Sequence, residues 1–140
     1  MEIKNKKAYF NYFIEDEIEA GLVLVGTEIK SVRKGSIDIS DSYILIKNNE
    51  AYNINMFIEK YESASIFNHE ETRERKLLLH KNEIRKLLEE VKQEGYTLVP
   101  LKVYLKNGKA KILIGVAKGK KLYDKREAIK KRDELRERRK

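Results

Sequence analysis

The clearest pattern along the chain is an alternation of apolar and polar side chains between residues 99 and 116. A period of two places every second side chain on one face of a β-strand. The two alternating runs are separated by Asn107-Gly108, which is typical of a hairpin because both central residues of a type I′ turn need positive φ. We therefore predict a β-hairpin. Its outer face carries Lys102, Lys106, Lys109 and Lys111.

A second hairpin is predicted around Asn48-Asn49, which separates the apolar run 43–46 from an alternating segment. In that segment we expect one face to carry Tyr52, Ile54, Met56 and Ile58. A further strand is expected through residues 18–25. Several short strands at close spacing favour a mainly β domain, either a small barrel or a sandwich.

Helical spacing is confined to short stretches of the chain. Between Lys81 and Glu94, apolar residues recur at i, i+3, i+4 and i+7, which predicts an amphipathic helix with one buried stripe. Gly95 follows at a position suited to a left-handed C-terminal cap. The spacing in 26–34 also favours a short helix.

The charge of the chain is concentrated at its C-terminal end. The 140 residues carry a net charge of +8, of which +7 lies in residues 118–140 and +1 in the first 117. Cations on phosphates release counterions, so a basic segment beside a near-neutral body favours binding of a polyanion. We therefore divide the chain into a body, 1–117, and a basic tail, 118–140.

The tail has helical signals but little apolar surface. Asp124 and Glu127 form a capping-box pattern, and favourable i, i+4 charge pairs follow. Charge pairs worth about 0.2–0.5 kcal/mol each do not replace a packing face. We expect a tail that is disordered when free and helical when bound to a partner.

Several function classes receive little support from the sequence. The absence of cysteine excludes thiolate metal sites and a disulfide framework, and only two histidines are present. The longest apolar runs are far too short to cross a membrane, so a soluble cytoplasmic protein is expected. The acidic stretch around Glu15, Glu17 and Glu19 leaves a metal-dependent nuclease as a second hypothesis, because carboxylates on one strand face hold metals or exchange protons.

Two segments combine cations with groups that contact nucleobases. Residues 72–81 place arginines, lysines and His80 around three successive leucines, at least one of which must face outward in a strand. Near the N-terminus, an aromatic cluster from Tyr9 to Phe13 follows Lys6 and Lys7, offering stacking surfaces beside charge. Packing of these leucines and aromatic rings in the core is the alternative interpretation.

Blocks throughout the chain resemble the small protein B family, the bacterial SsrA-binding proteins that bind transfer-messenger RNA. The most specific blocks are Glu19-Ala20-Gly21, residues 26–33, Asp41-Ser42-Tyr43, residues 75–81, residues 98–102 and residues 119–126. Their common order and spacing cover essentially the whole chain. One departure is Phe10, which occupies a place where many relatives carry histidine.

The resemblance implies an oligonucleotide-binding (OB) type closed β-barrel with flanking helices and a non-catalytic role in ribosome rescue. The body would bind the tRNA-like domain of transfer-messenger RNA. The tail would enter the empty mRNA channel of the small ribosomal subunit near the decoding centre and fold there as a helix. No cofactor, metal, membrane or small-molecule substrate is implied. A generic ribosome-associated OB-fold protein is a third hypothesis.

From the residues and the resemblance together, we expect two functional sets. The RNA-binding set of the body comprises Lys7, Glu19, Lys30, Arg33, Arg73, Arg75, Lys76, Leu78, His80 and Lys81. The ribosome-binding set comprises Phe10, Gly119, Lys120, Lys121, Tyr123, Asp124, Lys125, Arg126, Lys130, Lys131 and Arg132. Within these sets, the resemblance itself links Glu19, Leu78 and His80 to RNA binding.

Overall fold

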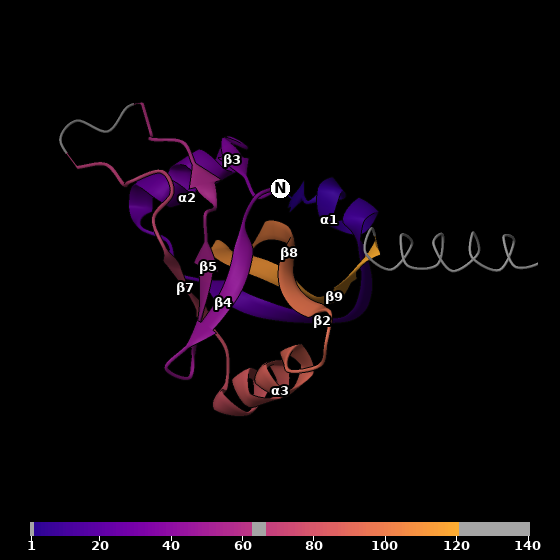
Figure 1. The fold of residues 1–140 in the computed structure, drawn as a ribbon. Coiled ribbons are helices and arrows are strands. Elements are labelled where there is room, and N and C mark those ends of the chain that lie inside the picture. The colour runs from indigo at the N-terminus through magenta and orange to yellow at the C-terminus, as the bar shows by residue number, and fades with distance from the viewer. Residues whose placement is uncertain (1, 63–66, 121–140) are drawn as a thin grey trace, which may run out of the picture.

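The structure is a computed structural model that describes residues 2–62 and 67–120 (Figure 1). Mainly β structure with three helices accounts for the described part of the chain. The elements are, in order, β1 (Glu2–Lys4), α1 (Lys6–Asn11), β2 (Tyr12–Leu22), α2 (Gly26–Arg33), β3 (Ile37–Asp38), β4 (Tyr43–Lys47), β5 (Glu50–Ile54), β6 (Phe57–Ile58), β7 (Arg75–Leu78), α3 (Lys81–Val91), β8 (Tyr96–Lys106) and β9 (Lys109–Gly119).

Seven of these strands form one antiparallel sheet in the order β1-β8-β9-β2-β7-β5-β4, while β3 and β6 form a small separate pair. The sheet is strongly curved, so its edge strand β4 comes to lie against β8 (Figure 1). No β-ladder joins these two strands. The predicted closed barrel is therefore wrong for the described residues, because the sheet remains open between β4 and β8.

The backbone of β8 near this gap is already used by Asn5. The amide group of the Asn5 side chain donates to the carbonyl of Pro100 at 2.8 Å, and the Asn5 backbone N–H donates to the carbonyl of Leu101 at 2.7 Å. Pro100 itself has no N–H to donate. The Asn5 carboxamide oxygen also caps α1 by accepting from the Ala8 N–H. Together with the pairing of β1 to residues 102–104, these bonds occupy this edge of β8 from Pro100 to Tyr104.

Both predicted hairpins are present, with the predicted turn residues. Asn107 and Gly108 have φ of 52° and 77° between β8 and β9, and Asn48 and Asn49 have φ of 53° and 61° between β4 and β5. The expected face of the second hairpin is wrong, since β5 buries Ala51 and Asn53 while Tyr52 and Ile54 are only half-buried. Asn55, with φ of 64°, ends the alternation, after which Met56 and Ile58 turn into the core.

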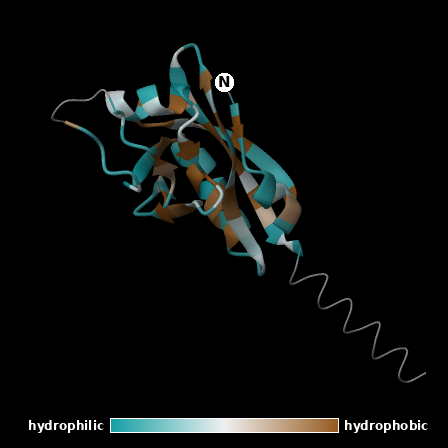
Figure 2. Cartoon of the chain, turned by 90° about the horizontal axis from the view of Figure 1, so that it is seen from above, coloured by the Kyte–Doolittle hydropathy of each residue, from teal (hydrophilic) through white to brown (hydrophobic). Residues whose placement is uncertain are grey.

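The helices close over the sheet (Figures 1 and 2). Helices α2 and α3 confirm the two predicted helical stretches, and α3 buries Ile84 and Leu87 as its stripe requires. Gly95 has the predicted positive φ but lies beyond the C-cap residue Lys92. Helix α1 was not predicted. The main core lies between the curved sheet and helices α2 and α3, and apolar residues there alternate with polar ones along the strands (Figure 2). Ala8 of α1 packs in a separate cluster with Val99, Leu101 and Ala117.

The end of β9 brings the body to the start of the tail. Gly119 pairs with Tyr12, so the last strand extends two residues beyond the predicted end of the body at 117. The prediction of a tail that is disordered when free concerns mainly residues 121–140, which lie outside the described residues. Among the described helices, none has the length and apolar character needed to cross a membrane.

A close approach between β9 and β8 gives a test of the sheet geometry. A Cβ atom at Gly115 would lie 2.9 Å from Cδ1 and 3.0 Å from Cγ of Leu101, which is fully buried. We expect Gly115→Ala to lower the free energy of unfolding by about 1–3 kcal/mol, because the core must shift to accept the methyl group. Urea denaturation measures this change. Gly26→Ala is the control, since nothing lies within 4 Å of the added methyl; equal stability of the two variants would contradict the packing.

Candidate nucleic-acid interface

The solvent-facing side of the sheet brings together residues that are far apart in the sequence. Gly21 of β2 lies directly opposite Leu78 of β7 on one side and Lys111 of β9 on the other, and Lys111 lies opposite Tyr104 of β8. Residues opposite each other in antiparallel strands share a face. Glu19 follows the same face two residues before Gly21. We call this surface the outer sheet face, made of Glu19, Gly21, Leu78, Lys102, Tyr104, Lys111 and Leu113.

Leu78 is the most exposed apolar group on the outer sheet face. Its exposed fraction is 58%, whereas Leu77 is buried, so one of the three successive leucines faces outward as the sequence required. The neighbouring Gly21 has no side chain to cover it, and a Cβ atom there would lie only 3.1 Å from the Leu78 Cβ atom. The glycine therefore leaves a flat apolar surface on which an unstacked base or a ribose could pack.

The carboxylate of Glu19 is held on this face by a tyrosine. The Tyr104 hydroxyl donates a short hydrogen bond to Glu19 Oε2, and Lys106 Nζ lies 4.0 Å from Glu19 Oε1. The hydrogen bond from Tyr104 lowers the pKa of Glu19, with the charges of Lys106 and Lys111 adding to the effect. Burial and the bond to Glu19 raise the pKa of Tyr104 to about 12. Sequence reasoning missed Tyr104, which is 85 residues from Glu19 in the chain.

Cations surround these groups. The predicted lysines of the β8–β9 hairpin include Lys102 and Lys111, both on the outer sheet face. Lys76 is exposed two residues before Leu78 and forms a 3.1 Å ion pair with Glu50. His80 and Lys81 follow β7 after Leu79, at the exposed start of α3. An apolar centre with lysines around it is suited to contacting both the bases and the phosphates of an RNA.

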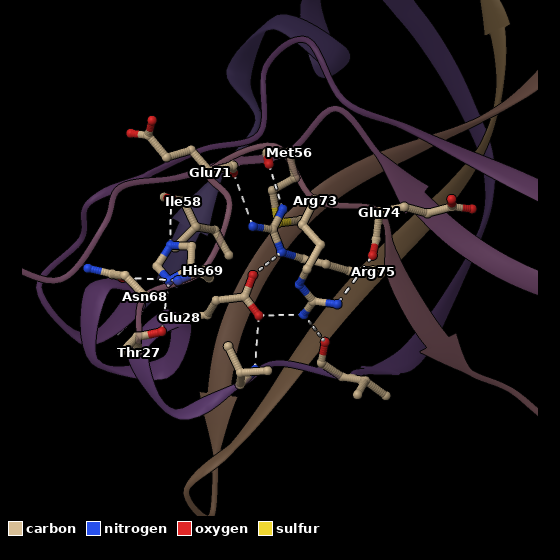
Figure 3. Close-up of polar contacts among 12 residues, drawn as sticks. Thr27, Glu28, Met56, Ile58, Asn68, His69, Glu71, Arg73, Glu74 and Arg75 are labelled. Atoms are coloured by element: carbon tan, nitrogen blue, oxygen red, sulfur yellow. Dashed lines mark hydrogen bonds and ion pairs between the residues drawn. The ribbon is translucent and has the colours of Figure 1, made fainter. Parts of the chain in front are cut away.

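Arg75, which we expected to bind RNA, is inside the protein (Figure 3). Its side chain has no exposed surface, and Arg75 Nε lies 2.5 Å from Glu28 Oε2. The Arg75 guanidinium also donates to the carbonyls of Met56 and Glu71, at 2.6 and 3.1 Å. The prediction is corrected for this residue because β7 alternates its side chains, so Arg75 points inward with Leu77 while its neighbours Lys76 and Leu78 point outward.

Arg73 is half-buried and joins the same network. Its Nη2 atom lies 2.5 Å from Glu28 Oε1, and the guanidinium donates further to the carbonyls of Val23 and Glu74. These bonds use much of the donor capacity of Arg73 for holding the fold (Figure 3). We therefore leave both arginines out of the proposed RNA-binding set.

Glu28 is the centre of this network. Burial by itself raises the pKa of Glu28, but hydrogen bonds from Arg73, from the Val25 N–H and from Arg75 outweigh burial and lower it. Next to it, His69 bridges the Ile58 carbonyl at 2.8 Å and the Thr27 hydroxyl at 2.9 Å through its two ring nitrogens. The network thus ties α2, β6 and the segment before β7 to one another (Figure 3).

The remaining predicted residues lie on other surfaces. Lys30 and Arg33 are exposed on α2, where Lys30 Nζ lies 5.3 Å from the ring centroid of Tyr61. Lys7 on α1 forms a 3.0 Å ion pair with Asp41. The structure therefore does not bring the whole RNA-binding set onto one face.

Phe10 and the start of the tail do lie together. Phe10 of α1 is 76% exposed, and Lys120 Nζ lies 3.5 Å from the Tyr9 carbonyl oxygen and 5.1 Å from the centroid of the Phe13 ring. We call this region, with Gly119, the α1–tail surface. Gly119 pairs with Tyr12 of β2, and Gly21 lies nine positions further along that strand, a distance of about 30 Å at 3.3 Å per residue. The other predicted tail residues, Lys121, Tyr123, Asp124, Lys125, Arg126, Lys130, Lys131 and Arg132, lie outside the described residues.

Comparison with known proteins identifies relatives along nearly the whole chain. The family model described as SmpB protein matches residues 2–140. The SsrA-binding protein of Shouchella clausii is 57% identical over 134 residues, covering 96% of this chain and 86% of that protein. The SsrA-binding protein of Acetivibrio thermocellus is 58% identical over 134 residues, covering 96% and 87%.

A solved structure agrees with these relatives. Its description is "tmRNA-SmpB: a journey to the center of the bacterial ribosome", and the matching chain has a TM-score of 0.72 and 46% sequence identity. The match covers 85% of this chain and 84% of that one. The similarity thus extends over fold and sequence together.

The buried network predicts a large cost for removing the charge of Glu28. We expect Glu28→Gln to lower the free energy of unfolding by about 3–5 kcal/mol, because Arg75 is then left buried without a counter-charge. Urea denaturation at neutral pH measures the loss. Glu89→Gln removes an exposed partner of Lys92 and is the control, for which we expect almost no change. A Glu28→Gln protein as stable as this control would contradict the assigned role of the ion pair.

Proposed function

Because the chain belongs to the SmpB protein family, we propose that it is the RNA-binding adaptor of trans-translation. In this role it binds transfer-messenger RNA (tmRNA, the SsrA RNA), delivers it to stalled ribosomes, and so allows ribosome rescue and tagging of the nascent peptide for degradation. The names of the SsrA-binding relatives and the tmRNA–SmpB structure support this role. It is a binding function without catalysis, exercised in the cytoplasm.

The observation that carries the proposal is the composition of the outer sheet face. Leu78 is exposed beside a glycine, and the carboxylate of Glu19 lies among lysines. The first 117 residues have a net charge of only +1. Non-specific RNA binding is largely electrostatic, so a near-neutral body favours recognition by shape and by specific contacts. We assign the tRNA-like domain of tmRNA to this face, with Lys76, His80 and Lys81 at its border.

The α1–tail surface is assigned to the ribosome. Lys120, at the point where the tail begins, contacts Tyr9 and Phe13, which lie on either side of the exposed Phe10 along the chain. From this point residues 121–140 would extend into the empty mRNA channel of the small subunit near the decoding centre, folding as a helix on ribosomal RNA. An mRNA that fills the channel would exclude the tail, which gives a physical basis for selecting stalled ribosomes. At the position of the family histidine, Phe10 retains a stacking surface but no hydrogen-bonding group.

Two further assignments follow from the same proposal. The body and the basic tail remain the two functional units, with β9 carrying the body's sheet to Gly119. The strong curvature of the sheet and the approach of β4 to β8 support an OB-type relationship for the body, although the sheet is open. Lys30 and Arg33 on α2 are kept as additional phosphate contacts because both are exposed.

Removing the apolar centre of the outer sheet face tests the proposed RNA site. We expect Leu78→Ala to weaken binding of the tRNA-like domain roughly five- to thirty-fold, corresponding to about 1–2 kcal/mol of lost contact. Fluorescence titration with excess bulk tRNA as competitor measures the affinity. Phe67→Ala is the control, because Phe67 is also highly exposed but lies outside the sheet. Equal affinities of both variants and the unaltered protein would contradict the site.

Deleting residues 121–140 tests whether RNA binding by the outer sheet face and ribosome binding by the tail are separate functions. The truncated chain retains all of β9, so we expect its affinity for the tRNA-like domain to be nearly unchanged. Tagging of peptides on stalled ribosomes, measured in a reconstituted translation system, should be lost because the channel contacts are missing. The full chain in the same reactions is the control. Normal tagging by the truncated chain would reject the assigned role of the tail.

A further inference from the structure

Glu19 and Tyr104 form a single unit on the outer sheet face. Glu19 belongs to β2 and Tyr104 to β8, so the bond between their side chains passes over the intervening strand β9. The Tyr104 hydroxyl occupies one carboxylate oxygen, Oε2. For the other oxygen, Oε1, the closest partner recorded within residues 2–62 and 67–120 is Lys106 Nζ at 4.0 Å. One oxygen is thus fixed by Tyr104, whereas Oε1 has only this long contact, and the Glu19 side chain is 38% exposed.

The presence of the Glu19 carboxylate on a surface proposed to bind RNA requires a physical explanation. Its charge repels phosphate, and the lysines alone would bind the backbone more strongly without it. A carboxylate is an acceptor of hydrogen bonds only. The RNA groups that donate are the N–H groups of base edges and the ribose 2′-hydroxyl.

We propose that Tyr104 is a positioning residue, which holds Glu19 so that Glu19 Oε1 accepts a hydrogen bond from a donor group of the bound RNA. This inference rests on the proposed function of the outer sheet face. In this arrangement, an unstacked nucleotide packs on the Leu78 side chain. Glu19 accepts a hydrogen bond from a donor group of that nucleotide or of its neighbour. Tyr104 itself need not touch the RNA.

The surroundings of Glu19 agree with this role. The groups that face it are Tyr104 and Lys106 on β8 and Lys111 on β9. Together they lower the pKa of Glu19, first through the Tyr104 hydrogen bond, so the carboxylate is ionised at neutral pH. Tyr104, with its pKa raised to about 12, remains a protonated donor throughout the physiological range; burial, Glu19 and Glu2 cause this rise.

The chain contains a matched control pair on the same two strands. The Tyr96 hydroxyl of β8 donates to Glu15 Oε2 of β2 at 2.7 Å, again over β9. Glu15 lies four residues before Glu19, toward the α1 end and away from Leu78. Loss of the Tyr96 hydroxyl therefore removes the same kind of hydrogen bond from the same sheet without disturbing Glu19.

A double-mutant cycle tests the coupling. The variants are Tyr104→Phe, Glu19→Gln and their combination in the full chain, with binding of the tRNA-like domain measured by titration. We expect Tyr104→Phe to weaken binding about ten-fold in the unaltered background, the range of a charge-assisted hydrogen bond, and to have little effect in the Glu19→Gln background. Tyr96→Phe should change nothing. Equal losses in both backgrounds, or no loss in either, would overturn the positioning role.

Titration of the Glu19 carboxyl carbon by NMR tests the same role in the free protein, apart from any RNA. The Tyr104 bond stabilises the ionised form, so Tyr104→Phe should move the Glu19 midpoint to higher pH, whereas Tyr96→Phe should leave it in place. An unmoved midpoint in Tyr104→Phe would reject the inference even if the RNA binds. If the midpoint moves but the unaltered protein shows no preference for the tRNA-like domain, the proposed function fails and the pair is only structural.

Three kinds of RNA modification distinguish the possible donors. Single 2′-deoxy substitutions remove ribose donors, and inosine in place of guanosine removes the N2 amino group. The substitution that removes the donor should abolish the affinity difference between the unaltered protein and Glu19→Gln. Abasic substitution at single positions removes every base-edge donor of that nucleotide, and a difference that survives all 2′-deoxy and all abasic substitutions in the contacted loop would overturn the acceptor role of Glu19.

Discussion

The buried ion pair between Glu28 and Arg75 is the constraint on which the rest of the structure depends. Two charges without exposed surface, 2.5 Å apart, are stable only while they remain together and their other hydrogen-bonding groups are satisfied. Arg75 meets this requirement through backbone carbonyls of the segments around β6 and before β7, and Glu28 brings α2 to the same point. Because strand side chains alternate, anchoring Arg75 inside also determines that Lys76 and Leu78 face solvent.

In this arrangement the arginine and lysine side chains have different roles. The arginines before and in β7 hold the fold, while the lysines of β7, β8 and β9 lie on the surface, where we propose that the RNA binds. The outer sheet face and the α1–tail surface occupy opposite ends of β2. A body that holds the RNA at one end and the ribosome at the other is suited to an adaptor, since the two partners then need not compete for the same surface.

Local signals predicted much of the fold. Asn107-Gly108 and the two-residue alternation specified the main hairpin, and the spacing in residues 81–94 specified α3, because these patterns depend on neighbouring residues alone. The open edge between β4 and β8 could not be predicted, since the placement of this edge involves contacts between distant residues, such as the bond from Asn5 to the carbonyl of Pro100, 95 residues away. The site residues stay a prediction: the structure places Glu19 and Leu78 on one face of the sheet, whereas Tyr104 was missed because only the register of β8 and β9 reveals it. Arg75 was misassigned as an RNA contact, although its alternation with Leu77 could have shown that it faces inward.

The most direct test of the central claim is an amide chemical-shift map of the full chain titrated with the tRNA-like domain of tmRNA. The account predicts that the largest shifts fall on the outer sheet face, in β2 near Gly21, in β7 near Leu78 and in the facing parts of β8 and β9. Saturation with RNA should leave the amides around Phe10 little changed. Shifts confined to the α1–tail surface, with the outer sheet face unaffected, would contradict the claim that this face of the sheet binds the RNA.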